Sequence, residues 1–379
     1  MIASGTIGRV EAEALLEATG AELDALFKAA REVREARTDR TITYSRKVFL
    51  PLTNLCRDQC GYCVFARHVS DARAHTMTPE EVVAVSRAGR QANCKEALFS
   101  LGERPELRYP EHRAWLGSRG YQTTLEYLRD MCRLVLDETG LLPHANPGTL
   151  TEDEIAMLKP FNVSMGMMLE SISERLLERG HAHYGCPDKV PAARLATLEA
   201  AGKHQVPFTT GILLGIGETR QERVDALLAI QEIHERYGQI QEVIVQNFRA
   251  KPETRFADRP EPDALEVART AAVARLLIGP EINVQVPPNL TPDAHELFLE
   301  AGINDWGGIS PVTRDYINPE KPWPQLRQLR STTASAGFVL RERLAVYPEF
   351  IQWLHGPLLE RARSFVGEDG LVLPSKEVW

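Results

Sequence analysis

Eight short apolar runs, each followed by a longer stretch with helical periodicity, constrain the fold of this chain more than any other feature. The runs are rich in β-branched and aromatic residues, as strands are, and the stretches between them repeat apolar residues on one helix face. The predicted strands cover residues 47–53, 96–101, 142–145, 162–167, 208–214, 242–248, 282–286 and 303–306. Strands separated by helices pair in parallel, and eight such units close a barrel. The sequence therefore predicts an α/β protein built on a TIM-type (β/α)8 barrel.

The segments outside the eight units predict additions to one barrel rather than a second domain. Residues 9–37 place apolar side chains at helical spacing among many Glu and Arg. The Pro-rich passages 250–263 and 318–324 are typical of long loops. We therefore expect a helical N-terminal lead-in at 1–40, the barrel at 41–310 and a C-terminal extension that packs on the barrel at 311–379.

Composition and charge exclude several classes of protein. The chain has 379 residues, 43% of them hydrophobic, and a net charge of −8 from 44 basic and 52 acidic residues. No basic run is interleaved with aromatic residues, which disfavours nucleic acid as a partner. No apolar run reaches the roughly 18 residues of a membrane span, and the start does not resemble a signal peptide. We expect a cytoplasmic protein that binds neither nucleic acid nor membrane.

Three cysteines lie close together directly after the first predicted strand. Cys56, Cys60 and Cys63 have the spacing C-x3-C-x2-C, and the C-terminal ends of barrel strands are where chemistry is usually placed. Zinc bound by three cysteines needs a fourth donor, for which His68 is the nearest histidine. A cubane iron–sulfur cluster bound by three cysteines instead leaves one iron open to another ligand. Both kinds of metal site remain possible from the spacing alone.

The same loop resembles the signature of the radical S-adenosylmethionine (SAM) enzymes, in which an aromatic residue, here Tyr62, precedes the last cysteine. The resemblance implies one [4Fe-4S] cluster whose open iron is chelated by the methionine part of SAM. Reductive cleavage of SAM then gives a 5′-deoxyadenosyl radical that abstracts hydrogen from the substrate. Cys56, Cys60 and Cys63 would be the cluster ligands and, through the radical, the catalytic residues.

The resemblance also implies SAM-binding residues at later strand ends. Glu103 in "SLGERPE" would accept from the SAM ammonium, although Leu101 stands where the family has a glycine. Glu170 and Ser171 could equally begin a helix, and Lys189 and Arg194 could be solvated charges. The full implied set is Tyr62, Glu103, Glu170, Ser171, Lys189, Arg194, Gly211 and Gly215.

Longer segments resemble one branch of these enzymes. "TYSRKVFLPLTNLCRDQCGYCVFAR", "VIVQNFRAKPET" and "AGINDWGGISPVTRDYINPEKPWP" are similar to the first-subunit type of 7,8-didemethyl-8-hydroxy-5-deazariboflavin (FO) synthases. The resemblance implies a lyase of coenzyme F420 biosynthesis that closes the deazaflavin ring and releases ammonia, methionine and 5′-deoxyadenosine. It also implies a companion radical SAM subunit that supplies the 4-hydroxybenzyl adduct, and a reductant of the ferredoxin or flavodoxin type.

Polar residues at predicted strand ends are candidates to hold the small-molecule substrate, because hydroxyl and amide groups of a ligand need buried hydrogen-bond partners. They are His144, Asn146, Gln246, Asn247, Asn289, Asp305 and Ser310. Two alternatives for the whole chain stay open. One is a neighbouring radical SAM enzyme, such as the tyrosine-using companion, a biotin synthase or a menaquinone-pathway enzyme. The other is a non-catalytic zinc or iron–sulfur protein.

The remaining cysteines and two histidines predict no second metal site. Cys94, Cys132 and Cys186 are scattered along the sequence, so we expect buried inert thiols that do not converge. His181 and His183 lack a nearby carboxylate or third histidine in the sequence, which makes metal binding by this pair an unfavoured interpretation.

Overall fold

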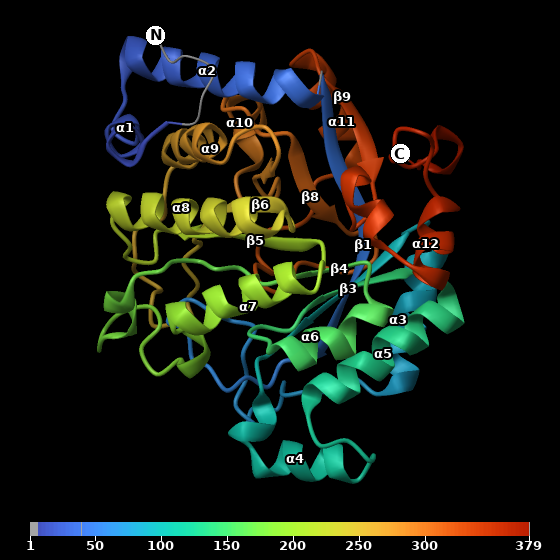
Figure 1. The fold of residues 1–379 in the computed structure, drawn as a ribbon. Coiled ribbons are helices and arrows are strands. Elements are labelled where there is room, and N and C mark those ends of the chain that lie inside the picture. The colour runs from blue at the N-terminus through green and yellow to red at the C-terminus, as the bar shows by residue number, and fades with distance from the viewer. Residues whose placement is uncertain (1–6, 39, 379) are drawn as a thin grey trace.

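The computed structural model describes residues 7–38 and 40–378, and its centre is a closed barrel of parallel strands (Figure 1). The strands follow one another around the barrel in sequence order, and β1 also pairs with β2, which closes the ring. They are β1 (Thr41–Thr53), β2 (Glu96–Leu101), β3 (Leu142–Asn146), β4 (Ser164–Gly166), β5 (Phe208–Leu214), β6 (Ile240–Asn247), β7 (Asn283–Gln285) and β8 (Asp305–Ile309). The predicted (β/α)8 barrel is confirmed, and every predicted strand overlaps an observed one.

Helices cover the outside of the barrel. They are α1 (Arg9–Leu15), α2 (Gly20–Thr38), α3 (Pro79–Gln91), α4 (Pro110–Gly117), α5 (Thr124–Thr139), α6 (Glu152–Leu158), α7 (Pro191–Lys203), α8 (Arg220–Tyr237), α9 (Ala264–Ile278), α10 (His295–Glu300), α11 (Leu326–Ser335) and α12 (Gly356–Arg363). Several begin with a threonine whose hydroxyl accepts from the N3 backbone N–H while the N3 glutamate bonds back, as at Thr78, Thr151 and Thr219. Within the described residues, no helix combines the length and the apolar character that a membrane span requires.

A ninth strand, β9 (Val339–Arg343), joins the barrel from the C-terminal segment. It pairs in parallel with the first half of β1, from Thr41↔Val339 to Ser45↔Arg343, while the second half of β1 pairs with β2 from Lys47 onward. β1 is therefore longer than predicted, because its first residues have partners on both sides.

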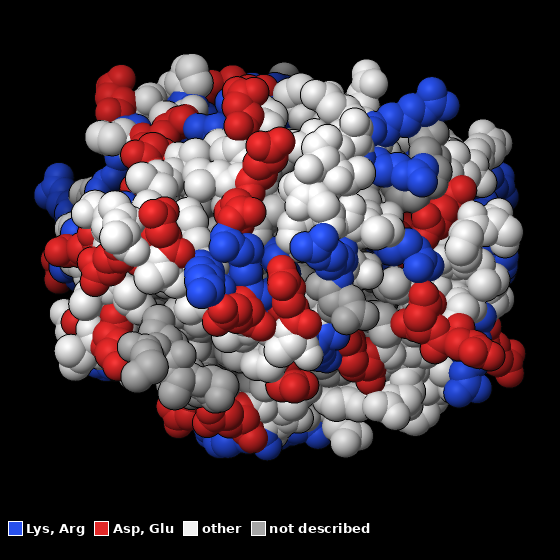
Figure 2. All heavy atoms as spheres, turned by 90° about the horizontal axis from the view of Figure 1, so that it is seen from above, with Lys and Arg blue, Asp and Glu red and all other residues white. Residues whose placement is uncertain are grey.

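The chain leaves β9 across the N-terminal end of the barrel, so that Arg343 and Ala345 line the barrel interior. Helix α2 also lies at this end, at the top of Figure 1. Figure 2 views the molecule from this side, and acidic and basic side chains are interspersed on the face it shows. The C-terminal segment thus contributes to the interior of the barrel as well as to its surface.

Candidate active site

The cysteine loop follows β1 and is fixed by close backbone contact with the end of β2. The N–H of Arg57 donates to the Glu103 carbonyl at 2.8 Å, and the N–H of Glu103 donates to Cys56 Sγ at 3.2 Å. Gly102 permits this approach, because a Cβ at that position would overlap the Leu55 carbonyl and lie 2.8 Å from Cys56 Cβ. The glycine in "SLGERPE" therefore shapes the cysteine loop.

The three loop thiols do not gather around a point that one ion could occupy. Among the described residues, no set of three cysteine or histidine ligand atoms lies within 4.8 Å of one another. His68 bonds Ser70 through Nδ1 at 2.9 Å and packs edge-on against Tyr109. A mononuclear Cys3His zinc site needs all four donors on one ion. Three separated thiols on one loop fit a cluster instead, because each cysteine then binds a different iron.

A fourth cysteine lies beside the loop. Cys186 Sγ is 3.7 Å from Cys60 Sγ, a contact that the sequence did not predict. The contact arises because residues 181–190 fold back against the loop, where the N–H of Gly61 donates to the Ala182 carbonyl at 2.7 Å. Cys132 is buried elsewhere, with Sγ 3.6 Å from the side chain of Asn162.

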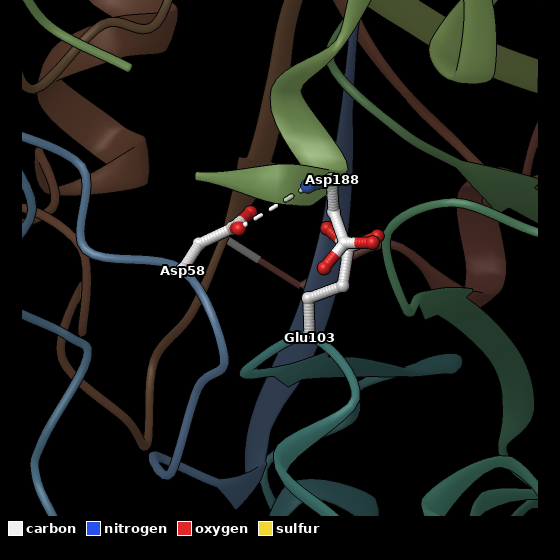
Figure 3. A group of neighbouring side chains, drawn as sticks. All are labelled: Asp58, Glu103 and Asp188. Carbon is white, nitrogen blue, oxygen red and sulfur yellow. Dashed lines mark hydrogen bonds between the residues drawn. The ribbon is translucent and has the colours of Figure 1, made fainter. Parts of the chain in front are cut away.

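Three buried carboxylates face one another next to Cys56 (Figure 3). Oxygens of Asp58, Glu103 and Asp188 lie within 4.8 Å of one another, and Asp58 accepts from the Asp188 N–H at 3.3 Å. Arg57 pairs with Asp188, whereas one Asp58 oxygen has no hydrogen-bond partner within the described chain. Burial, with a contribution from Glu103, raises the pKa of Asp58 to about 7. The group therefore favours an incoming positive charge, such as an ammonium.

A second polar network surrounds Glu170, on the loop after β4. Its carboxylate accepts from the Tyr62 hydroxyl at 2.6 Å and pairs with Lys189 Nζ at 2.8 Å and His183 Nε2 at 3.0 Å. Burial alone would raise the pKa of Glu170, but Lys189 and His183 hold it well below its usual value. The cysteine loop is thereby tied to a carboxylate that stays ionised. Sequence reasoning did not identify His183 as part of this network, since its partner is distant in the chain.

The structure places the other predicted SAM-binding residues around these two networks. Arg194 Nη1 is 3.9 Å from a Glu103 oxygen and donates to the Asp188 carbonyl, while Arg194 Nε donates to the Met168 carbonyl. The Ser171 hydroxyl accepts from the Ser173 N–H at 3.1 Å, which is a local turn contact. Gly211 packs on the backbone of Ile244. Gly215 has a φ of +90°, which residues with a side chain rarely adopt.

A cavity of about 310 Å³ runs from the cysteine loop into the barrel. Inward-facing side chains alternate along each strand, so Glu242, Ile244 and Gln246 of β6 line it at successive depths. At the deepest level lie the floor residues, defined as Lys47, Thr209, Glu242 and Arg343. Above them is an apolar belt that includes Leu98, Ile244 and the stacked rings of Phe49 and Trp323, whose centroids are 5.1 Å apart. Amide side chains and the cysteine loop surround the outer end.

Five of the seven substrate candidates line this cavity: His144, Asn146, Gln246, Asn247 and Asn289. The side-chain oxygens of Asn247 and Asn289 are buried without a hydrogen-bond partner in the described chain. Burial lowers the pKa of His144 to about 3, so its ring is neutral while it bonds Asn146 and Ser164. The cavity therefore offers hydrogen-bond acceptors without a partner in the described chain, together with neutral polar groups.

The remaining two candidates lie outside the cavity lining. Asp305 is fully buried and binds Arg343 through both oxygens, at 2.6 and 2.7 Å. The Ser310 hydroxyl caps the turn that follows β8, where it accepts from the Thr313 N–H at 2.9 Å. Sequence reasoning missed Lys47, Glu242 and Arg343. For Lys47 a signal existed, because a charged residue at an inward position of a strand is uncommon.

Comparison with known proteins agrees with this arrangement. The model of the Radical SAM superfamily matches residues 50–230, which include the cysteine loop, Glu103 and Glu170. A 7,8-didemethyl-8-hydroxy-5-deazariboflavin synthase of Methanopyrus kandleri is 50% identical over 331 residues, or 87% of this chain and 99% of that protein. An FO synthase of Nocardia farcinica is 52% identical over 90% of this chain, which spans 41% of that protein.

Solved structures agree on the fold. The FeFe-hydrogenase maturase HydG of Carboxydothermus hydrogenoformans has a TM-score of 0.72 at 19% identity and covers 94% of this chain and 84% of its own. Methylornithine synthase PylB has a TM-score of 0.69 at 16% identity and covers 88% of this chain and 94% of its own. Because this chain is 50% identical to the M. kandleri synthase over 99% of that protein's length, it belongs to the FO synthase family of radical SAM enzymes.

Proposed function

We propose that this protein closes the deazaflavin ring of FO, the chromophore of coenzyme F420. The substrate would be 5-amino-5-(4-hydroxybenzyl)-6-(D-ribitylimino)-5,6-dihydrouracil, used with SAM, and the by-products ammonia, methionine and 5′-deoxyadenosine. The observation that carries the proposal is the 50% identity that covers 99% of the archaeal synthase, a protein of similar length to this chain. The cavity supports it, since polar groups for a ribityl chain and a pyrimidine surround a belt for aromatic rings.

We assign the SAM contacts to the two polar networks beside the cysteine loop. Glu103, next to Cys56 and facing Asp58, suits the SAM ammonium because it offers a buried negative charge. Lys189, which pairs with Glu170 at 2.8 Å, and Arg194, whose Nη1 is 3.9 Å from Glu103, suit the SAM carboxylate. Cys56, Cys60 and Cys63 would hold a [4Fe-4S] cluster, which together with SAM would supply the radical that removes hydrogen from the substrate. The apolar belt and the amide side chains at the outer end of the cavity then keep the two substrate rings in place and exclude water.

The adduct would come from a companion radical SAM protein, and the electron from a ferredoxin or flavodoxin. The N. farcinica relative fits a division of labour, because this chain spans only 41% of its length. In that arrangement the companion activity resides in the remainder of the longer protein.

The test is anaerobic turnover. Reconstituted enzyme receives dithionite, SAM and the purified adduct, and both 5′-deoxyadenosine and deazaflavin fluorescence are followed. We expect both products, and we expect neither from Cys60→Ala. Cys132→Ala is the matched control, because it removes a buried thiol outside the cysteine loop.

Two outcomes would contradict the proposal. Formation of 5′-deoxyadenosine without fluorescence would keep the radical chemistry but assign another substrate, such as that of a neighbouring pathway. Zinc in place of iron, with no SAM cleavage, would remove the radical mechanism altogether.

A further inference from the structure

Lys47 is a buried cation on the cavity floor whose hydrogen-bonding capacity is only partly used. Its side chain is 9% exposed, and Nζ pairs with Glu96 at 2.7 Å. An ammonium has three donors, so two remain for a ligand. The side chain crosses the space left by Gly308, where any Cβ would overlap its terminal carbons. β8 thus leaves room for Lys47 to reach the interior.

Glu242 supplies acceptors at the same depth. One carboxylate oxygen accepts from Arg343 at 3.2 Å and the other from the Thr209 hydroxyl at 3.0 Å. Each carboxylate oxygen can accept two hydrogen bonds, so both retain capacity. Arg343 is itself held by Asp305 and the Leu344 carbonyl. It therefore fixes the position of the Glu242 carboxylate, whose oxygens can still accept further hydrogen bonds. The floor therefore places spare donors beside spare acceptors.

A hydroxyl group both donates and accepts, so such a floor suits a chain of hydroxyls better than an aromatic ring. Rings have the apolar belt above, where Phe49 and Trp323 stack. The orientation of the substrate in the cavity follows from the proposed reaction, on which this inference rests. Atoms that change bonds belong to the two rings, the carbon that joins them, the departing amino group and the imine nitrogen, and these must lie near the cysteine loop. The ribityl hydroxyls are the part of the substrate farthest from them.

We propose that Lys47 and Glu242 form a subsite for the polyhydroxylated side chain of the substrate, with the ribityl chain directed to the barrel floor and the rings toward the cysteine loop. Arg343 acts on this subsite as a positioning residue, because it orients Glu242. Since Arg343 comes from β9, the C-terminal segment takes part in substrate selection.

The alternative is that Lys47–Glu96 and Arg343–Glu242 are structural ion pairs with no ligand. The chain offers a matched control for this possibility. Lys95 pairs with Glu342 at 2.8 Å, is as buried as Lys47, and lies outside the cavity lining. Lys95→Met therefore removes a buried Lys–Glu pair without touching the subsite.

The experiment measures binding rather than turnover. The adduct and an analogue with an ethyl group in place of the ribityl chain are titrated calorimetrically into reconstituted enzyme with SAM. Wild type should bind the adduct ~100-fold or more tightly than the analogue, since several hydrogen bonds to charged groups are at stake. Lys47→Met and Glu242→Gln should each weaken adduct binding ~10-fold or more and change analogue binding less than about twofold. Lys95→Met should leave the ratio of the two affinities unchanged.

Equal binding of adduct and analogue by wild type would overturn the subsite, as would equal losses for both ligands in Lys47→Met and Glu242→Gln. If Lys47→Met does not fold, Glu242→Gln carries the same comparison, because it keeps the side-chain shape. Turnover is scored separately. A protein that makes no deazaflavin but shows the ribityl-dependent binding would refute the reaction and leave the subsite standing.

Discussion

Replacing Arg343 by methionine tests whether β9 holds the barrel floor together through charge. The guanidinium is 2% exposed and binds Asp305 at 2.6 and 2.7 Å and Glu242 at 3.2 Å. Methionine fills similar space but leaves two buried carboxylates without their cation. Removal of one partner from a buried ion pair costs about 3–5 kcal/mol. Because a folded domain is stable by only about 5–15 kcal/mol, the variant should lose a large part of its unfolding free energy.

The loss should depend on pH. Burial already raises the pKa of Glu242, and Arg343 opposes that rise. Without Arg343 the pKa in the folded state rises further above its unfolded value. A carboxyl with a raised folded pKa adds stability below the unfolded pKa and loses it as pH increases through the folded pKa. The difference between wild type and Arg343→Met should therefore be larger at pH 8 than at pH 5.

The assay is equilibrium urea unfolding of the cluster-free protein, followed by circular dichroism at both pH values. Arg87→Met is the control, since its pair with Glu138 at 2.7 Å is exposed and should contribute at most about 1 kcal/mol. Asp305→Asn combined with Glu242→Gln should restore part of the stability lost in Arg343→Met. A loss below about 1 kcal/mol, or one that is the same at both pH values, would refute the reasoning.

Three further predictions concern the cysteine loop and the barrel interior. Gly102→Ala should abolish reconstitution, measured as iron per chain, because its Cβ would overlap the loop backbone, whereas Gly117→Ala meets nothing within 4 Å and should bind iron normally. Tyr62→Phe should raise the SAM dissociation constant roughly 10-fold in calorimetry, because Glu170 loses a 2.6 Å hydrogen bond from the cysteine loop. In His144→Gln, the free energy of unfolding measured with urea should fall less steeply than in wild type as the pH decreases. The folded pKa of His144 is about 3, below its ordinary 6.5, so wild type loses up to about 1.4 kcal/mol per pH unit between these values.

Each of these has an outcome that would count against it. Full iron loading of Gly102→Ala would mean that the loop can shift to accept a side chain. An unchanged SAM affinity in Tyr62→Phe would separate the Glu170 network from SAM binding. A parallel pH profile in His144→Gln would show that His144 is hydrated in the folded protein. The exposed His355→Gln controls for loss of a histidine as such.

The barrel could be predicted because its signal is local and repeated. A strand such as Phe208–Leu214 has no charged residue and is buried along its whole length, as expected for a strand covered on both sides. β9 could not, because "VLRER" contains three charged residues and makes no apolar run. Its strand form depends on the free edge of β1, which is a contact between opposite ends of the chain. Local propensity carries no information about such a pairing.

The candidate site shows the same difference between local features, which the sequence predicts, and long-range contacts, which it does not. The spacing of Cys56, Cys60 and Cys63 could predict a metal-binding loop, because ligand spacing is a local property. The contact between Cys186 and Cys60 could not be predicted, because it depends on how residues 181–190 fold back. Lys47 and Glu242 could have been found from the period-two alternation of their strands, which places them inside with Phe49 and Ile244.

The late position of β9 has a consequence for how the protein is made. During synthesis all eight barrel strands leave the ribosome before residues 339–343, so the ring can close while the first half of β1 still exposes an unpaired edge. Such an edge invites pairing with another chain. Premature termination shortly after residue 310 should therefore yield a nascent barrel that is open at one end and prone to self-association. Residues 339–343 would then act as an intramolecular chaperone for the first strand.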